Sequence, residues 1–149
     1  MIKPLTRKDK EVFTSLMREF YNSPAVLHPL PDGMYDRVFQ ALLRSAVGRG
    51  YLIADNDQNT AGYAVVSSAF SVEAGGEILW IEDIYLRPEF RGKGLAKEFF
   101  AFAESSFPSA CRLRLEAEKS NLSAVALYRR LGFTELDYMQ MIKDLDSKD

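Results

Sequence analysis

The stretch from Ile78 to Lys97 constrains the fold of this chain more than any other part of it. It begins with a run of strand-forming apolar residues, interrupted by two adjacent carboxylates, Glu82 and Asp83. Pro88 cannot donate a ladder hydrogen bond and therefore ends the strand. The glycine-rich sequence Arg-Gly-Lys-Gly follows, and a helix is predicted after it. A strand, a glycine-rich turn and a helix start together predict an anion site, because unpaired N–H groups and the helix dipole both favour negative charge there.

The glycine-rich turn departs from two common phosphate-binding patterns. The nucleotide P-loop requires Gly-x-x-x-x-Gly-Lys-Ser/Thr, and neither its spacing nor its final hydroxyl is present. The dinucleotide fingerprint Gly-x-Gly-x-x-Gly matches at Gly92 and Gly94 but has Lys97 in place of the third glycine. Arg91, Gly94 and Ala96 instead satisfy Arg/Gln-x-x-Gly-x-Gly/Ala. This pattern resembles the diphosphate-binding signature of the GNAT superfamily of CoA-dependent N-acetyltransferases.

Length and composition narrow the class of protein. A chain of 149 residues, 47% of them hydrophobic, fits one globular domain, taken as residues 1–149. The net charge of −2 and the lack of a basic run predict no nucleic-acid partner. The apolar segments are too short to span a membrane, and the first residues are too polar for a signal peptide. A single cysteine suits a reducing compartment, so we expect a cytoplasmic protein.

Periodicity and turn residues predict an α/β (α+β) domain with a mixed, mostly antiparallel sheet of six or seven strands and about four helices. Strands are expected at residues 2–5, 51–54, 61–67, 78–86 and 110–117, with closing strands at 133–135 and 137–145 before a charged tail. Helices are expected from Thr6 to Asn22, from Asp32 to the glycines at 48 and 50, from Arg91 to Phe107 and from Asn121 to Leu131.

The strand–helix–strand passage implies that Ile78–Leu86 and Ala110–Ala117 pair in parallel through a right-handed crossover. A parallel pair inside an otherwise antiparallel sheet can splay at one end and expose backbone N–H groups to a ligand. In the resembled family the pantetheine arm of acetyl-CoA lies in that slot. The resemblance therefore implies that backbone groups of Ile84 and Leu86 pair with the arm. It assigns the diphosphate to Arg91, Gly92, Lys93, Gly94, Leu95 and Ala96, although a purely structural turn with solvated basic side chains would have the same sequence.

A second motif, Asn-x-x-Ala-x-x-Leu-Tyr followed shortly by Gly-Phe, begins at Asn121 and resembles the family's other CoA-side element. Asn121 and Tyr128 are about two helical turns apart and therefore share a face. In relatives the asparagine contacts the CoA arm and the tyrosine hydroxyl lies beside the sulfur. Each residue also has a structural alternative, because Asn121 is a good N-cap and Tyr128 suits a core with its hydroxyl at the surface.

The resemblance implies direct acetyl transfer from acetyl-CoA to an amine, with no metal and no acetyl-enzyme. Glu82, acting through a water, is the predicted base, and Tyr128 the predicted acid. Asp83 is predicted to bind the cationic substrate or to relay its proton. Neighbours on a regular strand point to opposite faces, so both acids reach one site only if a bulge or twist intervenes. Pairing of the acids with Arg or Lys is the structural alternative, and Cys111 is expected in the core rather than as a nucleophile.

The acceptor is less well defined. The sequence Ile-Glu-Asp-Ile-Tyr-Leu resembles the diamine and polyamine acetyltransferases, and its acidic pair favours a small cationic amine. His28, in the loop at 25–33, is a candidate acceptor contact, although a lone loop histidine is commonly only solvated. Tyr21, Tyr35 and Phe70 are further candidates on the same side. Alternative functions are acetylation of a protein N-terminus, a lysine or an aminoglycoside, a non-catalytic CoA-binding domain, and nucleotide binding. By analogy with the family we also expect a possible homodimer.

Overall fold

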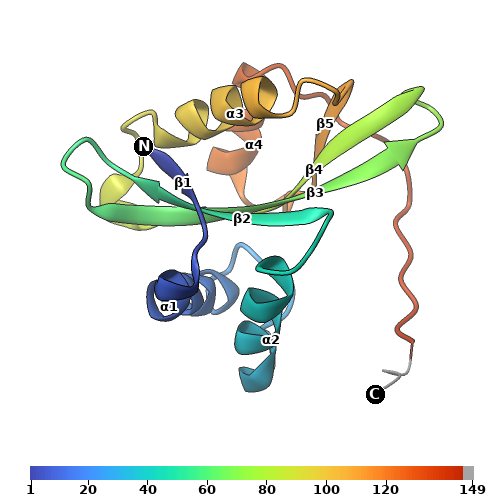
Figure 1. Cartoon of the computed structure of the whole chain (residues 1–149). Coiled ribbons are helices and arrows are strands. Elements are labelled where there is room, and N and C mark those ends of the chain that lie inside the picture. The colour runs from blue at the N-terminus through green and yellow to red at the C-terminus, as the bar shows by residue number, and fades with distance from the viewer. Residues whose placement is uncertain (146–149) are drawn as a thin grey trace.

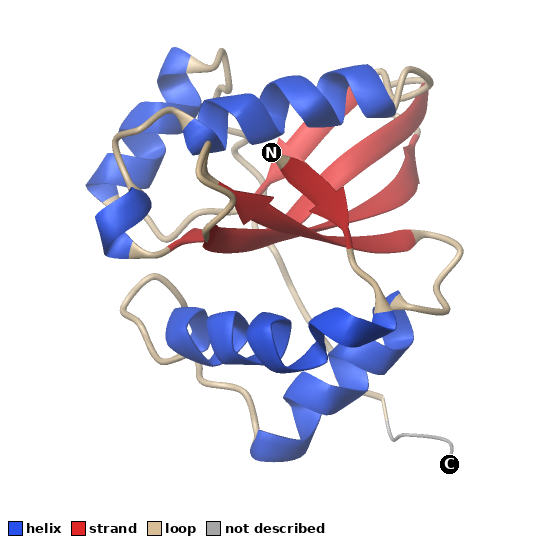
Figure 2. Cartoon of the chain, turned by 60° about the vertical axis from the view of Figure 1, so that its left-hand side comes forward, coloured by secondary structure: helices blue, strands red, loops and turns tan. Residues whose placement is uncertain are grey.

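A five-stranded sheet in the order β1–β2–β3–β4–β5 separates two pairs of helices (Figure 1). The computed structural model describes residues 1–145. Its strands are β1 (Ile2–Pro4), β2 (Gly48–Ala54), β3 (Thr60–Ser71), β4 (Gly76–Leu86) and β5 (Arg112–Leu115). Its helices are α1 (Lys10–Tyr21), α2 (Asp32–Leu42), α3 (Leu95–Ser106) and α4 (Leu122–Arg130), with single 3-10 turns η1 (Arg7–Asp9) and η2 (Pro88–Phe90). Helices α1 and α2 lie on one face of the sheet, and α3 and α4 on the other (Figures 1 and 2).

The two faces carry separate cores. Against α1 and α2, the aromatic rings of Phe13, Phe39 and Tyr63 pack together and are fully buried. Against α3, Leu79 and Ile81 of β4 contact Phe99 and its neighbours. Strands β2, β3 and β4 contribute to both clusters, because alternate residues of a strand point to opposite faces. The sheet therefore forms a wall between two helical layers.

The predicted parallel pair is present, and it is short. Strands β1 to β4 pair antiparallel, while β4 and β5 pair in parallel through α3. Within the described residues, β5 pairs only with the first part of β4, from Ile78 opposite Arg112 to Ile81 opposite Leu115. The rest of β4, up to Leu86, keeps β3 as its neighbour but has no strand on its other side. This is the splayed end that the sequence predicts.

Several element predictions are wrong. Residues 1–145 contain five strands rather than six or seven, since 133–135 and 137–145 form none. In the second of these segments Tyr138, Met139 and Met141 are 64–86% exposed, and no strand of the described chain pairs with them. A strand needs a partner ladder as well as a pattern. The charged residues after Leu145 lie outside the described part of the chain.

The glycines expected to stop the second helix belong to a strand. Helix α2 ends at Leu42, and both Gly48 and Gly50 lie in β2. A Cβ on Gly50 would lie 2.3 Å from the Leu5 side chain, so this glycine allows the chain before α1 to cross the sheet closely. Boundaries elsewhere also shift: the helix predicted from Arg91 begins at Leu95, and β5 covers only part of the predicted 110–117 strand. None of the helices in residues 1–145 has the length and apolarity needed to cross a membrane.

Candidate functional site

The corner between η2 and α3 presents a set of free backbone N–H groups. Gly92 and Gly94 have φ angles of 73° and 83°, and a Cβ built on either would meet nothing within 4 Å. The N–H of Arg91 is used within η2, where it donates to the Pro88 carbonyl at 3.2 Å. The first backbone bond of α3 joins the Glu98 N–H to the Gly94 carbonyl at 3.0 Å, so the earlier donors of that turn have no helical acceptor. Within the described chain the free donors are those of the six consecutive residues Gly92, Lys93, Gly94, Leu95, Ala96 and Lys97.

The side chains of this corner add positive charge. The Arg91 guanidinium folds back over β4, where its Nε donates to the Leu86 carbonyl at 2.9 Å and it lies 5.9 Å from the Tyr85 ring. The Lys93 ammonium lies 5.1 Å from the Phe90 ring and is exposed. Free N–H groups at a helix N-terminus, together with two cations, form an arrangement that suits a diphosphate. Glycine is needed at Gly92 and Gly94 because their positive φ angles are ones that L side chains rarely adopt.

The backbone of β4 faces the splayed gap at Ile84 and Leu86. The Arg87 N–H donates to the Ala61 carbonyl of β3 at 2.9 Å, so the N–H of Arg87 points toward β3. Because these directions alternate along an antiparallel strand, the N–H groups of Ile84 and Leu86 point away from β3. Since β5 no longer pairs with this part of β4, those donors are available to an extended ligand.

A β-bulge at Glu82 brings both acids to the face covered by α1 and α2. In the β3–β4 register, Val66 lies opposite Ile81 and Val65 opposite Asp83, so Glu82 is the extra residue. Glu82 is exposed and accepts a hydrogen bond from the Ser67 hydroxyl. The geometric condition for two adjacent acids to share a site is therefore met. Within residues 1–145 neither acid takes part in an ion pair, so the structural alternative of pairing with Arg or Lys is not seen.

Asp83 is held by two tyrosines in a partly buried position. Its carboxylate accepts hydrogen bonds from the Tyr21 hydroxyl at 3.0 Å and from the Tyr63 hydroxyl at 2.9 Å. Burial raises the pKa of Asp83, the two tyrosine hydrogen bonds lower it, and the neighbouring Glu82 carboxylate raises it again, with a net upward shift. Burial and the Asp83 charge raise the pKa of both tyrosines, so they stay protonated and donate. The site thus concentrates negative charge with no cation of the described chain to balance it.

Asp83→Asn is expected to raise the melting temperature at pH 7.5. The pKa of Asp83 is raised in the folded state, so the ionised carboxylate is disfavoured by folding at neutral pH. That penalty is largest above the folded-state pKa and disappears as the pH falls to the unfolded value near 3.9. The gain from the substitution should therefore shrink on acidification, as followed by thermal unfolding across this pH range. A lower melting temperature at pH 7.5 would mean that the tyrosine hydrogen bonds outweigh desolvation.

Tyr128 and Asn121 lie on the opposite side of the sheet. The Tyr128 ring packs edge-to-face on Phe100 and Phe133, with centroids 5.9 and 6.0 Å away. Burial raises the pKa of its hydroxyl, and within the described residues that hydroxyl has no hydrogen-bond partner. Asn121 is the N-cap of α4, with its side-chain oxygen 3.3 Å from the Ala124 N–H. The structural alternatives are thus both present, and they leave the Tyr128 hydroxyl free.

The remaining candidates are scattered. His28 is exposed on the loop between α1 and α2, and no hydrogen bond or ion pair in residues 1–145 joins it to the acidic pair. Of the three aromatic candidates, Tyr21 contacts Asp83, Tyr35 is buried in the core, and Phe70 is 74% exposed near the end of β3. The expectation of a buried Cys111 is wrong: the thiol is exposed, because β5 begins one residue later and the alternating pattern does not extend to it.

The comparisons with known proteins agree with this geometry. The Acetyltransferase (GNAT) family matches residues 10–133. The chain is 32% identical over 120 residues to streptothricin acetyltransferase from Streptomyces lavendulae, covering 78% of this chain and 61% of that protein. It is 35% identical over 77 residues to thialysine N-epsilon-acetyltransferase from Bos taurus, covering 50% and 45%. The chain thus spans less than two thirds of the length of these relatives.

Solved structures show the same fold. An integron cassette protein from the mobile metagenome of Cole Harbour Salt Marsh superposes with a TM-score of 0.76 at 30% identity, over 98% of this chain and 91% of that one. AAC(6')-Iy, solved in complex with a CoA-containing bisubstrate analogue, superposes with a TM-score of 0.78 at 18% identity, over 97% of both chains. Members of the matched family use acetyl-CoA, and the open glycine corner and the splayed strand fit that molecule. The chain belongs to the GNAT acetyltransferase family.

Proposed function

We propose that this protein transfers the acetyl group of acetyl-CoA directly to a primary amine of a small cationic acceptor. The observation that carries the proposal is the β-bulge at Glu82, where β4 also loses β5 as its neighbour. At that point one strand exposes backbone donors toward the gap and carboxylates toward α1 and α2. The binding site for acetyl-CoA and the acidic site for the amine can therefore meet at β4.

The donor is held by backbone more than by side chains. The free N–H groups from Gly92 to Ala96 would bind the diphosphate, with Arg91 and Lys93 adding charge. The N–H groups of Ile84 and Leu86 would pair with the pantetheine arm. Bound acetyl-CoA supplies an acetyl group activated as a thioester. Asn121 lies at the start of α4, on the face of the sheet that α3 and α4 cover (Figure 1), and its amide nitrogen remains available to the pantetheine arm.

The acceptor must lose a proton before it reacts. An amine with a pKa near 10.4 is neutral in only about 1 in 2,500 molecules at pH 7, which adds roughly 4.6 kcal/mol to the barrier. Glu82 is exposed on the bulge and is the base in this proposal, acting through a water. Asp83, fixed by Tyr21 and Tyr63, would hold the ammonium group of the acceptor. The Tyr128 hydroxyl would donate its proton to the departing thiolate.

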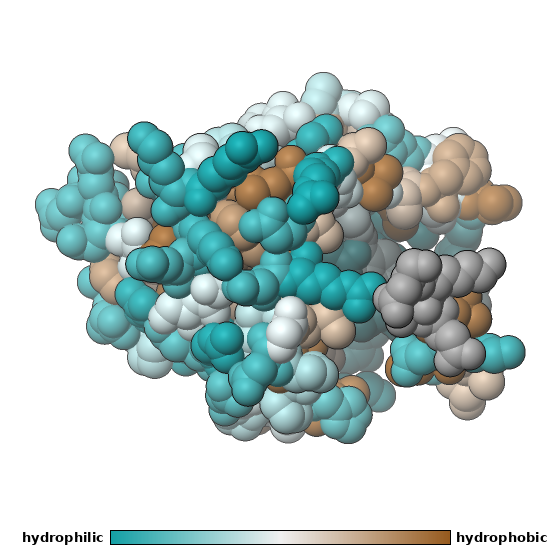
Figure 3. All heavy atoms as spheres, turned by 60° about the horizontal axis from the view of Figure 1, so that its bottom comes forward, coloured by the Kyte–Doolittle hydropathy of each residue, from teal (hydrophilic) through white to brown (hydrophobic). Residues whose placement is uncertain are grey.

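Charge and surface character support a polar acceptor. The acidic pair has no cationic partner within the described chain, and the surface seen from the side of α1 and α2 is mostly hydrophilic (Figure 3). The relatives named for streptothricin and thialysine make these two compounds sensible members of an acceptor screen, beside diamines and polyamines. A cytoplasmic location and a homodimer remain predictions.

Acetyl-CoA is expected to stabilise the protein in thermal unfolding. A ligand at a hundred times its dissociation constant adds about 2.7 kcal/mol of stability, and CoA should act similarly while ATP and NAD should not. Purified protein would then be given acetyl-CoA with each acceptor, and release of free thiol would be measured. Stabilisation by ATP or NAD but by neither CoA compound would overturn the proposal. Binding of acetyl-CoA with no turnover on any amine would instead indicate a CoA-binding domain.

A further inference from the structure

The splayed part of β4 has β3 as its one neighbouring strand in the described chain, and α1 holds it from one face of the sheet. From Asp83 onward, the alternate residues Asp83, Tyr85 and Arg87 turn toward α1, and all three make polar contacts with its last turn. The Tyr21 hydroxyl donates to Asp83, and the Glu19 carboxylate accepts from the other two. The segment that must serve both substrates is thus held along its length from one side.

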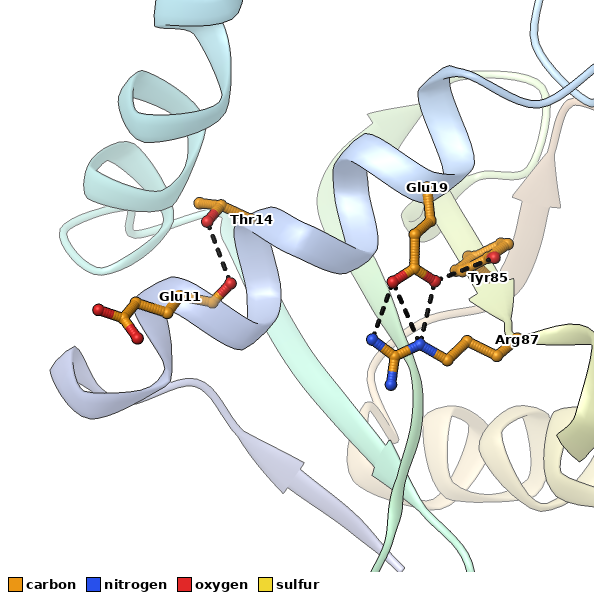
Figure 4. Close-up of polar contacts among 5 residues, drawn as sticks. All are labelled: Glu11, Thr14, Glu19, Tyr85 and Arg87. Carbon is orange, nitrogen blue, oxygen red and sulfur yellow. Dashed lines mark hydrogen bonds and ion pairs between the residues drawn. The ribbon is translucent and has the colours of Figure 1, made fainter.

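Glu19 forms the strongest of these contacts (Figure 4). Its carboxylate accepts from the Arg87 Nη2 at 2.8 Å and from the Arg87 Nε at 3.0 Å, a two-point pairing of planar groups. It also accepts from the Tyr85 hydroxyl at 3.3 Å. The side chains of Glu19 and Arg87 are 34% and 29% exposed, so the pair is partly shielded from water. The Arg87 hydrogen bond is the main cause of the lowered pKa of Glu19, which keeps the carboxylate ionised.

The contacts of Glu19 continue to the glycine corner. Tyr85 and Arg87 flank Leu86, whose N–H faces the gap and whose carbonyl accepts the Arg91 Nε at 2.9 Å. The same Arg91 guanidinium lies over the Tyr85 ring. Arg91 therefore contacts two residues that Glu19 helps to place. Tyr85 is itself a partner of Glu19, and Leu86 lies between its partners Tyr85 and Arg87.

We propose that Glu19 is a positioning residue for acetyl-CoA binding, acting through Tyr85 and Arg87 on Leu86 and Arg91. This inference rests on the proposed function. The last turn of α1 would then support both substrates, because Tyr21, two residues after Glu19, donates to Asp83, which is proposed to bind the amine. Loss of the Glu19 charge should loosen the donor site and leave the acceptor site nearly intact. A purely structural ion pair would instead change stability with no preference for either substrate.

Glu19→Gln tests this directly, because it removes the charge and keeps the shape of the side chain. We expect acetyl-CoA and CoA to bind roughly tenfold more weakly in calorimetry, with the KM of the acceptor changed less than about twofold. Lys10→Gln is the matched control, since it breaks another ion pair of α1, the one with Asp36 at 3.0 Å. That variant should bind CoA like the wild type.

Two further variants separate positioning from folding. Arg87→Lys keeps the charge but loses the two-point pairing, so it should weaken CoA binding in the same direction as Glu19→Gln. In Glu19→Gln combined with Arg87→Lys, the loss should be smaller than the sum of the two single losses, because both act through one contact. If the wild type binds CoA and Glu19→Gln binds it equally well with only a lower melting temperature, the inference is overturned. Failure of the wild type itself to bind CoA would overturn the proposed function.

Discussion

Replacing Tyr128 with phenylalanine is expected to lower kcat by about a hundredfold or more, which is the usual contribution of a positioned acid. The ring packs on Phe100 and Phe133, and this packing survives the loss of one oxygen. Since burial raises the pKa of the Tyr128 hydroxyl, it is protonated throughout the neutral range and can donate to sulfur as the thiolate leaves. Steady-state turnover and calorimetric binding of acetyl-CoA should therefore separate, with kcat reduced and affinity retained.

Glu82→Gln provides the comparison for this variant. It removes the proposed base on the other side of the strand, so its defect should be largest for acceptors of high pKa and smaller for amines that are already partly neutral. Tyr128→Phe should slow all acceptors alike, because the leaving group is the same. If Tyr128→Phe turns over as fast as the wild type, the tyrosine is a packing residue and the acid must be sought elsewhere.

Gly62→Ala is expected to destabilise the protein by about 3 kcal/mol or more, the upper range for overpacking, and to lower the melting temperature by roughly 10 °C. A Cβ on Gly62 would lie 1.9 Å from the Tyr85 carbonyl oxygen and 2.9 Å from the Leu86 side chain. The first of these is backbone in the β3–β4 ladder, directly beside the gap, and it cannot move without disturbing that ladder. Any protein that remains folded should also bind acetyl-CoA less tightly.

Gly33→Ala serves as the control for Gly62→Ala in a thermal unfolding experiment. Gly33 lies in the first turn of α2, and a Cβ there would meet nothing within 4 Å. Alanine is the better helix former, so this variant should be unchanged or slightly more stable. A melting temperature for Gly62→Ala within two or three degrees of the wild type would contradict the close approach of β3 and β4.

The parts of the site that follow from local sequence could be predicted. Each of three features depends on residues close together in the chain: the glycine corner, the parallel strand pair and the helix start at Asn121. Their residue types therefore indicate the structure directly. The need for a bulge could be predicted as well, because Glu82 and Asp83 are adjacent. Its position opposite Val65 and Val66 could not, since it depends on the register of another strand.

The remaining features depend on contacts between distant residues. Nothing around Glu19 identifies Arg87 as its partner, because the pair forms only once α1 lies across β4. Tyr63 carries a core pattern, and its hydroxyl meets Asp83 only through the pairing of β3 with β4. The predicted strands at 133–135 and 137–145 fail for the same reason, because no other strand of the described chain pairs with them.

The extra residue in β4 has a consequence for how this strand can vary. Before it, odd-numbered Leu79 and Ile81 belong to the core under α3; after it, odd-numbered Asp83 and Tyr85 turn toward α1. The strand thus changes parity once along its length: before Glu82 the odd-numbered residues pack under α3, and after it the even-numbered Ile84 and Leu86 do. Because Ile81 lies opposite Val66 and Asp83 opposite Val65, deleting Glu82 would leave a regular ladder in which Asp83, Tyr85 and Arg87 keep their face of the sheet and one carboxylate is lost. The extra residue therefore adds a second carboxylate to the α1 side of the sheet without changing the face of the residues that follow it.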